Sequence, residues 1–106
     1  MATIGTFNKN GEGFTGIIRT LAFTASVTIA PVTRKRGEKS PDYRLYVQSS
    51  GPAEIGAAWE RSFEGVAYLS VRIDDPIFPT AINCRLIQAD DEDGYSLTWE
   101  RQRPRD

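Results

Sequence analysis

Hydrophobic and polar residues alternate along much of this chain with the period of two that is typical of β-strands. The segment 68–73 is the clearest case. Leu69, Val71 and Ile73 fall on one face of a predicted strand, and polar or aromatic residues fall on the other. The segment 95–99 alternates in the same way. Each of these strands can build a core through one face and present its second face for binding.

Further strand signals are separated by turn residues, which is the pattern of a small all-β domain. We expect the clearest strands at 2–7, 14–23, 26–32, 41–47, 68–75, 81–87 and 95–101. Asn10-Gly11 and Asp93-Gly94 are typical of hairpin turns. The polar segment 33–40 is predicted to be an exposed loop, and two prolines exclude 74–79 from a strand ladder. The predicted fold is a barrel or a compact sandwich, with an oligonucleotide-binding type barrel as one candidate.

The segment 52–63 is ambiguous between helix and strand. Its alanines favour a helix, and Trp59 lies four residues after Ile55, a helical spacing. The segment is short, however, contains Gly56 and has strand signals on both sides. We interpret it as a strand, which brings the expected number of strands to seven or eight.

The composition is that of one soluble globular domain. The chain has 106 residues, and we expect the domain to occupy 1–100 and a polar tail to occupy 101–106. The net charge is −1, so no global field draws the protein to nucleic acid or to an anionic membrane. No signal peptide and no apolar run of membrane-spanning length is visible. We therefore expect a cytoplasmic protein that has no membrane association.

Few residues offer catalytic or metal-binding chemistry. The chain has no histidine, the commonest general base and metal ligand. Cys84 shares a predicted face with apolar residues, so we interpret it as a buried thiol. Asp74-Asp75 could bind a cation but more often caps a turn, and the acidic run 90–93 has Ala89 where a calcium loop needs its first ligand. We expect a protein that is not an enzyme and has no cofactor and no metal.

Aromatic and basic residues concentrate between 34 and 72. Single-stranded nucleic acid is bound by cations that contact phosphates and by aromatic rings that stack on bases. The candidate binding residues are Arg34, Lys35, Arg36, Tyr43, Arg44, Tyr46, Trp59, Arg61, Tyr68 and Arg72. Alternation places Arg44 with Tyr46, and Tyr68 with Arg72, on one face of their strands. The competing interpretation is that the aromatics pack in the core or at a sheet edge, and that the arginines pair with carboxylates.

Several of these runs resemble a known family. The chain is similar to the bacterial domain-of-unknown-function family DUF736 at 1–7, 41–44, 54–59, 68–76 and 92–97, and at Phe78 and Trp99. The resemblance implies a protein encoded on conjugative plasmids and integrative elements, and it implies no biochemical activity or catalytic residue. A looser similarity, through the Pro-Asp-Tyr, Ala-Trp and Leu-Ser series, is to small phage proteins regarded as single-stranded-DNA-binding-like.

These observations lead to one main hypothesis and two alternatives. We expect a non-enzymatic protein of a mobile element that binds nucleic acid, in particular single-stranded DNA, through an aromatic and basic sheet face. The first alternative is a protein-interaction module that inhibits a host defence complex or adapts conjugation machinery, which the near-neutral charge also fits. The second is a homo-oligomer that pairs through exposed sheet edges.

Overall fold

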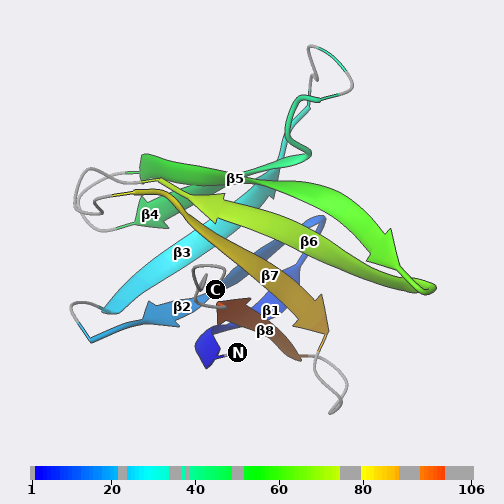
Figure 1. Ribbon diagram of the computed structural model, residues 1–106. Helices are drawn as coiled ribbons and strands as arrows, with labels where there is room; N and C mark the ends of the chain where they lie inside the picture. Colours follow the sequence, from blue (N-terminus) through cyan, green and yellow to red (C-terminus); the bar gives the residue numbers. More distant parts are fainter. Residues whose placement is uncertain are drawn as a thin grey trace.

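The alternating segments form one closed antiparallel barrel in the computed structural model of the protein (Figure 1). The structure describes residues 2–21, 24–33, 37, 39–48, 52–74, 80–88 and 94–99. The strands are β1 (Ala2–Asn10), β2 (Gly13–Arg19), β3 (Thr24–Pro31), β4 (Tyr43–Gln48), β5 (Pro52–Phe63), β6 (Val66–Ile73), β7 (Ile82–Gln88) and β8 (Gly94–Trp99). The all-β prediction is therefore confirmed.

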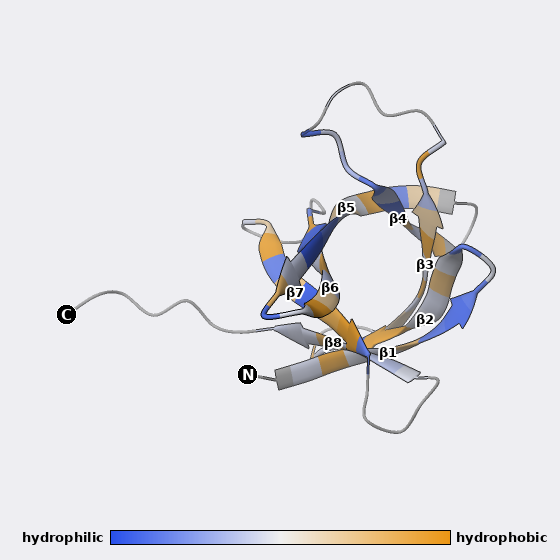
Figure 2. Ribbon diagram, turned by 90° about the vertical axis from the view of Figure 1, so that its right-hand side faces the viewer, coloured by the Kyte–Doolittle hydropathy of each residue, from blue (hydrophilic) through white to orange (hydrophobic). Residues whose placement is uncertain are grey.

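Every strand pairs with its neighbour in the sequence, and β1 closes the ring by pairing with β8. Viewed from the side of the barrel opening, the strands follow one another around a single circle (Figure 2). This is an up-and-down barrel of eight strands. It differs from the five-stranded Greek-key barrel of oligonucleotide-binding domains, and it is not a two-sheet sandwich. Of the architectures expected from the sequence, the barrel is the one observed.

The segment 52–63 is a strand along its full length, so the prediction made for it is confirmed. The spacing of Ile55 and Trp59, which resembles that of a helix, comes from a bulge in this strand. The pairing of β4 with β5 shifts register between Leu45 and Tyr46, so that Leu45 lies opposite Gly56 and Tyr46 lies opposite Glu54. Ile55 is the extra residue of this bulge, and it contributes to the core. The bulge interrupts the simple alternation that would have identified the strand.

The expected limits of the first strands need correction. β1 extends to Asn10, three residues beyond the predicted end at 7, because its last residues pair with the start of β2. β2 ends at Arg19 instead of 23. Gly11 has φ 64°, in the left-handed region expected of a hairpin residue. The predicted turn after Asn10 is confirmed, and the predicted strand was too short on one side of it and too long on the other.

Large apolar side chains fill the barrel interior, as the alternation predicts. Phe7, Ile29, Leu45 and Leu97 are at most 1% exposed. The Phe7 ring lies against Gly16, its partner on β2, where a side chain would collide with the ring and with backbone. Glycine at this position thus makes room for an aromatic ring in a barrel whose interior is just wide enough for its own side chains.

The β5–β6 hairpin extends beyond the rest of the ring (Figure 1). Glu64 and Gly65 form its two-residue turn with φ 51° and 82°. Two positive φ values in succession are typical of a type I′ turn, whose twist matches that of the flanking strands. Phe63 and Val66 flank the turn and are 68% and 58% exposed. The hairpin therefore carries apolar side chains at an exposed tip.

Some sequence predictions fall outside the described residues. They concern the basic residues at 34–36, the turn at 49–51, the proline-containing loop at 75–79, the acidic run at 90–93 and the tail at 101–106. Within the described residues, the structure contains no helix of the length and apolar character needed to span a membrane.

Candidate functional site

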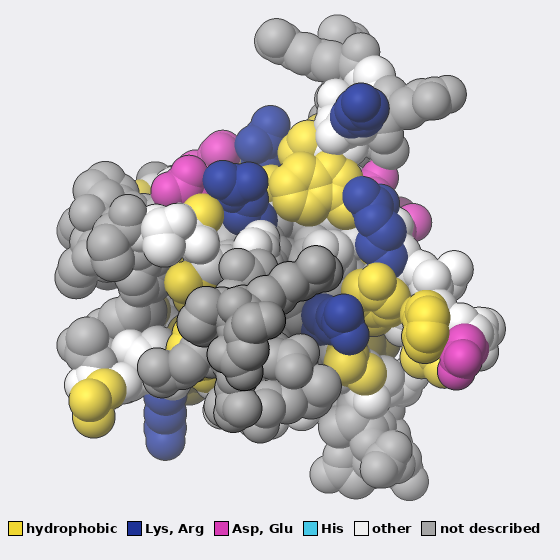
Figure 3. Space-filling model, in the orientation of Figure 1, with side chains coloured by type: hydrophobic (Ala, Val, Ile, Leu, Met, Phe, Trp, Pro, Cys, Tyr) yellow, Lys and Arg dark blue, Asp and Glu magenta, His cyan; other side chains and the backbone are white. Residues whose placement is uncertain are grey.

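Outward-facing basic and aromatic side chains cover neighbouring strands from β4 to β7. Because the strands are antiparallel and in register, residues that pair across the strands form rows on the outer surface. We call this surface the β4–β7 face. Its members are the outward residues Arg44, Tyr46, Trp59, Arg61, Tyr68, Arg72 and Arg85. In the space-filling view, basic side chains gather around a hydrophobic patch in the upper part of the visible surface, with acidic side chains at its edges (Figure 3).

The first row runs from Arg44 through Ala57 to Arg72. Ala57 pairs with both arginines, one on β4 and one on β6. Because its methyl group is small, a shallow depression of about 230 Å³ lies between the two arginines, and Gly56 and the carboxylate side chains Glu54 and Asp74 also line it. The Arg44 guanidinium also contacts Glu54, at 3.3 Å between Nη1 and Oε2, and both side chains are about half exposed. An ion pair as exposed as this is weak, so a phosphate can compete for the arginine.

The second row runs from Trp59, which is half-buried on β5, through Ser70 on β6 to Arg85 on β7. The indole Nε1–H donates a hydrogen bond to the backbone carbonyl of Lys39, at 3.0 Å. This bond satisfies the polar atom of the indole and leaves its π system as the remaining contact surface. It also places exposed Lys39, at the end of the basic loop, beside the β4–β7 face.

The third row pairs Arg61 with Tyr68 across β5 and β6. A further cation lies beside this row. The guanidinium carbon of Arg85, on β7, is 5.5 Å from the centre of the Tyr68 ring. Arg85 is not among the binding residues predicted from the sequence. Its position between buried Cys84 and buried Leu86 indicated an outward side chain, but its proximity to Tyr68 depends on the register of β6 with β7.

Tyr43 does not share this face. It packs against the core, with its ring centroid 6.0 Å from that of Phe14, inside the barrel. Its hydroxyl donates to Glu60 Oε1 at 3.3 Å. Partial burial raises the pKa of Tyr43 above its ordinary value of 10.0, and the charge of Glu60 and the hydrogen bond to it act in the same direction. Of the four aromatics expected at the surface, only Tyr46, Trp59 and Tyr68 point outward.

Asp42 fixes the start of β4 against β5. Its amide donates to the carbonyl of Ala58, at 2.9 Å, and its carboxylate Oδ2 accepts from the amide of Glu60, at 2.8 Å. Its carbonyl accepts from the amide of Val32, at 2.9 Å. These bonds join both ends of the loop between β3 and β4 to the barrel. They give a structural reason for an aspartate between Pro41 and Tyr43, and they orient the neighbouring Glu60.

The one cysteine of the chain lies in the buried core. Cys84 is 4% exposed, and burial raises the pKa of its thiol to about 12. A thiol in that environment is neither a nucleophile nor a metal ligand at neutral pH. No group of three or more histidine, cysteine, aspartate or glutamate side chains that could hold a metal ion occurs among the residues that the structure describes.

Comparison with known proteins gives one match. The model of a family described as "Protein of unknown function (DUF736)" matches residues 3–102, and the resemblance found in the sequence is thereby confirmed. No curated protein and no solved structure matches the chain. The looser similarity to phage single-stranded-DNA-binding-like proteins receives no support from these comparisons.

Proposed function

The chain belongs to the DUF736 family, and because that family is one of unknown function, we propose from the geometry that the protein binds single-stranded nucleic acid through its β4–β7 face. The observation that carries the proposal is the succession of three neighbouring rows. Arginines occur in each of them, and outward aromatic rings occur in two. Same-face residues on one strand are about 7 Å apart along it. A flexible strand of nucleic acid can therefore meet cations and rings in turn.

The electrostatic part of the proposed binding free energy comes from Arg44, Arg61, Arg72 and Arg85. Each phosphate that an arginine neutralises releases condensed counterions, so binding to a single strand weakens with salt by a slope of about 0.7 per contact. We propose that one phosphate enters the depression between Arg44 and Arg72, displaces the Glu54 carboxylate from Arg44 and is held by both guanidinium groups. Arg34, Lys35 and Arg36 complete the proposed set, because the Trp59 contact holds Lys39 of the same loop beside this face.

The aromatic term comes from Tyr46, Trp59 and Tyr68. Stacking of a base on an aromatic ring is worth about 1–3 kcal/mol and tolerates any base, so it adds affinity without strict sequence specificity. We further propose that single-stranded DNA of a conjugative or integrative element is the cellular ligand, encountered during transfer or replication in the bacterial cytoplasm. The protein performs no chemistry on this DNA in our proposal.

The test uses a carboxylate placed between the two arginines. Ala57→Glu repels a phosphate from the depression and pairs with both guanidinium groups. The matched control is Ser26→Glu, which adds the same charge at an exposed position of β3. Fluorescence anisotropy of labelled single strands at low ionic strength should show weaker binding by Ala57→Glu alone. Equal losses in both variants, or no binding by the unmodified protein, would contradict the proposal.

The salt dependence of single-strand binding gives a second, independent test of the proposal. In a double Arg44→Ala, Arg72→Ala variant we expect weaker binding and a slope of log K against log salt that is shallower by about 0.7, for the one phosphate that the two arginines hold together. The control is Arg19→Ala, which removes an exposed cation on β2. An unchanged slope in the double variant would show that these arginines do not contact phosphate.

One observation favours a second candidate, a protein-interaction role. Phe63 and Val66 expose apolar side chains at the tip of the β5–β6 hairpin, where solvent contact is unfavourable. A second copy of the chain could cover them. Sedimentation of the unmodified protein and of a Phe63→Ser, Val66→Ser variant tests this. A concentration-dependent dimer lost in the variant supports tip-mediated association, and a monomer in both excludes it.

A further inference from the structure

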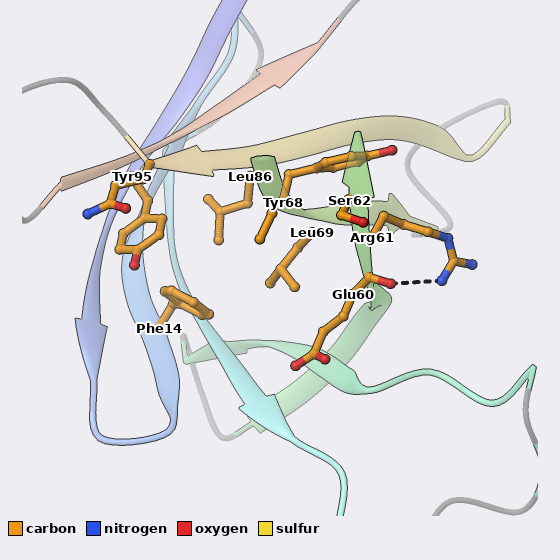
Figure 4. Close-up of a pocket in the computed structure, with 10 residues that line it drawn as sticks. Phe14, Glu60, Arg61, Ser62, Tyr68, Leu69, Leu86 and Tyr95 are labelled. Carbon is orange, nitrogen blue, oxygen red and sulfur yellow. Dashed lines mark hydrogen bonds between the residues drawn. The ribbon is translucent and has the colours of Figure 1, made fainter. Parts of the chain in front are cut away.

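One end of the barrel opens into a cavity of about 810 Å³, which we call the mouth. Its floor is apolar, formed by Leu69 and Leu86, which are 7% and 1% exposed. Phe14 and Tyr95 stand together on one side, with ring centroids 4.9 Å apart in an edge-to-face arrangement. Figure 4 shows these four side chains directed toward the hollow. The volume is within the range of small-molecule sites, about 300–1,000 Å³.

Among the described residues that line the mouth, Glu60 is the carboxylate, and it lies opposite the aromatic pair. Glu60 pairs with Leu69 across β5 and β6 and so shares the inward face of the strands. The Tyr43 hydroxyl donates to one of its oxygens, and the Asp42 carboxylate holds its amide. A carboxylate can accept about four hydrogen bonds, so it retains capacity for a donor on a ligand. The site thus joins a flat apolar surface to a positioned anionic acceptor.

The cations lie on the other side of the same rim. Arg61 follows Glu60 directly, and strand alternation turns it outward, where its Nη1 donates to the Glu60 carbonyl at 2.9 Å. Figure 4 shows Arg61 and Tyr68 directed away from the hollow while Glu60 is directed toward it. An anionic group is therefore favoured outside the rim, and a hydrogen-bond donor on an aromatic ring is favoured inside it.

We propose that the mouth receives an unpaired nucleobase that carries an exocyclic amino group, such as cytosine or adenine. The base would lie over the apolar floor beside Phe14 and donate from its amino group to Glu60, while its phosphate stays at Arg61 outside the rim. Carboxylates accept hydrogen bonds from the cytosine amino group in many complexes. Thymine and uracil have no such donor and present a carbonyl oxygen that the carboxylate repels. This inference rests on the proposed function and adds to it a preference among bases.

The test compares labelled oligodeoxycytidylate and oligothymidylate of equal length by fluorescence anisotropy. We expect the protein to bind the cytosine strand about 5-fold or more tightly, the lower limit of what one good base contact provides. Glu60→Gln keeps the size of the side chain and an acceptor for Tyr43, but its amide can donate to the thymine carbonyl. The preference should therefore disappear or reverse in that variant. Glu64→Gln, at the exposed hairpin turn, is the control and should keep the preference.

The possible failures are distinguishable. If neither strand binds, the proposed function fails. If both bind equally to the unmodified protein, or if Glu60→Gln keeps the preference, the mouth is not a base site while the β4–β7 face stands. Titration with free deoxycytidine and thymidine, followed through Tyr95 chemical shifts, identifies the source of the base. Shifts with deoxycytidine alone indicate a nucleoside site, and a preference seen only with oligonucleotides indicates a base presented by a bound strand.

Discussion

The Arg85 guanidinium lies 5.5 Å from the centre of the Tyr68 ring, across the pairing of β6 with β7. This contact holds a cation and a stacking surface together on the β4–β7 face. A cation over an exposed ring contributes only about 0.5–1 kcal/mol, so it positions the two groups more than it stabilises the barrel. Arg85 lies over one face of this ring, so a base that stacks on Tyr68 would take the opposite face and have a phosphate-binding group close by.

Replacement of this cation tests whether the face extends to β7. We expect Arg85→Ala to weaken binding of single strands and to reduce the salt slope by about 0.7, one phosphate contact. The unfolding midpoint in urea should remain close to that of the unmodified protein. Arg19→Ala is the matched control, because Arg19 is an exposed arginine on β2, four strands around the ring from β6. A salt slope that both variants leave unchanged would confine the face to β4, β5 and β6.

Much of this face follows from the sequence, because alternation alone decides which side chains of a strand point outward. Arg44 with Tyr46, and Tyr68 with Arg72, share the outer surface as expected. The prediction that Tyr43 belongs to this face was wrong for the same reason, because two adjacent residues of a strand cannot share a face. Tyr43 and Arg44 are such neighbours, and the tyrosine is the one that points inward.

The rest of the site depends on pairing between strands. Arg85 meets Tyr68 because Leu69 pairs with Leu86, and the mouth exists because β8 pairs with β1. A barrel and a sandwich can be built from the same alternating segments, so local pattern does not decide between them. The bulge at Ile55 is a similar case. It reverses the expected direction of side chains on either side. Gly56, the residue after Ile55, is a local sign of it, because an isolated glycine in a strand often marks a bulge, but the glycine alone does not give the register.

The partial burial of Tyr43, together with the charge of Glu60 and the hydrogen bond to it, predicts that stability falls at high pH. Because the folded-state pKa of Tyr43 is raised above 10.0, its contribution is fully present below about pH 10 and is lost as the pH rises toward the folded-state value. Tyr43→Phe should cost about 0.5–1.5 kcal/mol at neutral pH, the usual worth of one hydrogen bond. The free energy of unfolding of this variant should also decline less above pH 10 than that of the unmodified protein. Urea unfolding at a series of pH values measures both effects, and parallel declines would contradict the assignment.

Cys84 should be unreactive in the folded protein. Burial raises its thiol pKa from 9.0 to about 12, so the thiolate is absent from the native state at neutral pH. A thiol reagent should therefore react only as fast as the barrel opens, and urea should accelerate the reaction. Rapid modification without urea would show that the thiol is accessible.

The same burial makes stability depend on pH above 9. As the pH rises, the unfolded chain loses the thiol proton before the folded protein does. The contribution of the thiol to the free energy of unfolding is therefore complete below about pH 9. Above that pH it falls by up to about 1.4 kcal/mol per pH unit until the pH reaches the folded-state pKa of about 12. Cys84→Ala removes the titrating group and should flatten the decline relative to the unmodified protein. Equal slopes for the two proteins between pH 9 and 11 would exclude the thiol as its source.

Gly16 should be among the least replaceable residues of the barrel wall. A methyl group there would meet the Thr6 carbonyl and the Phe7 ring, and Phe7 is 1% exposed in the core. Gly16→Ala should therefore cost about 1–3 kcal/mol, the usual penalty for overpacking a core. Gly37→Ala is the control, because an added methyl group at exposed Gly37 meets nothing within 4 Å. Urea midpoints that fall equally in the two variants would mean that the close approach of β1 to β2 does not limit this position.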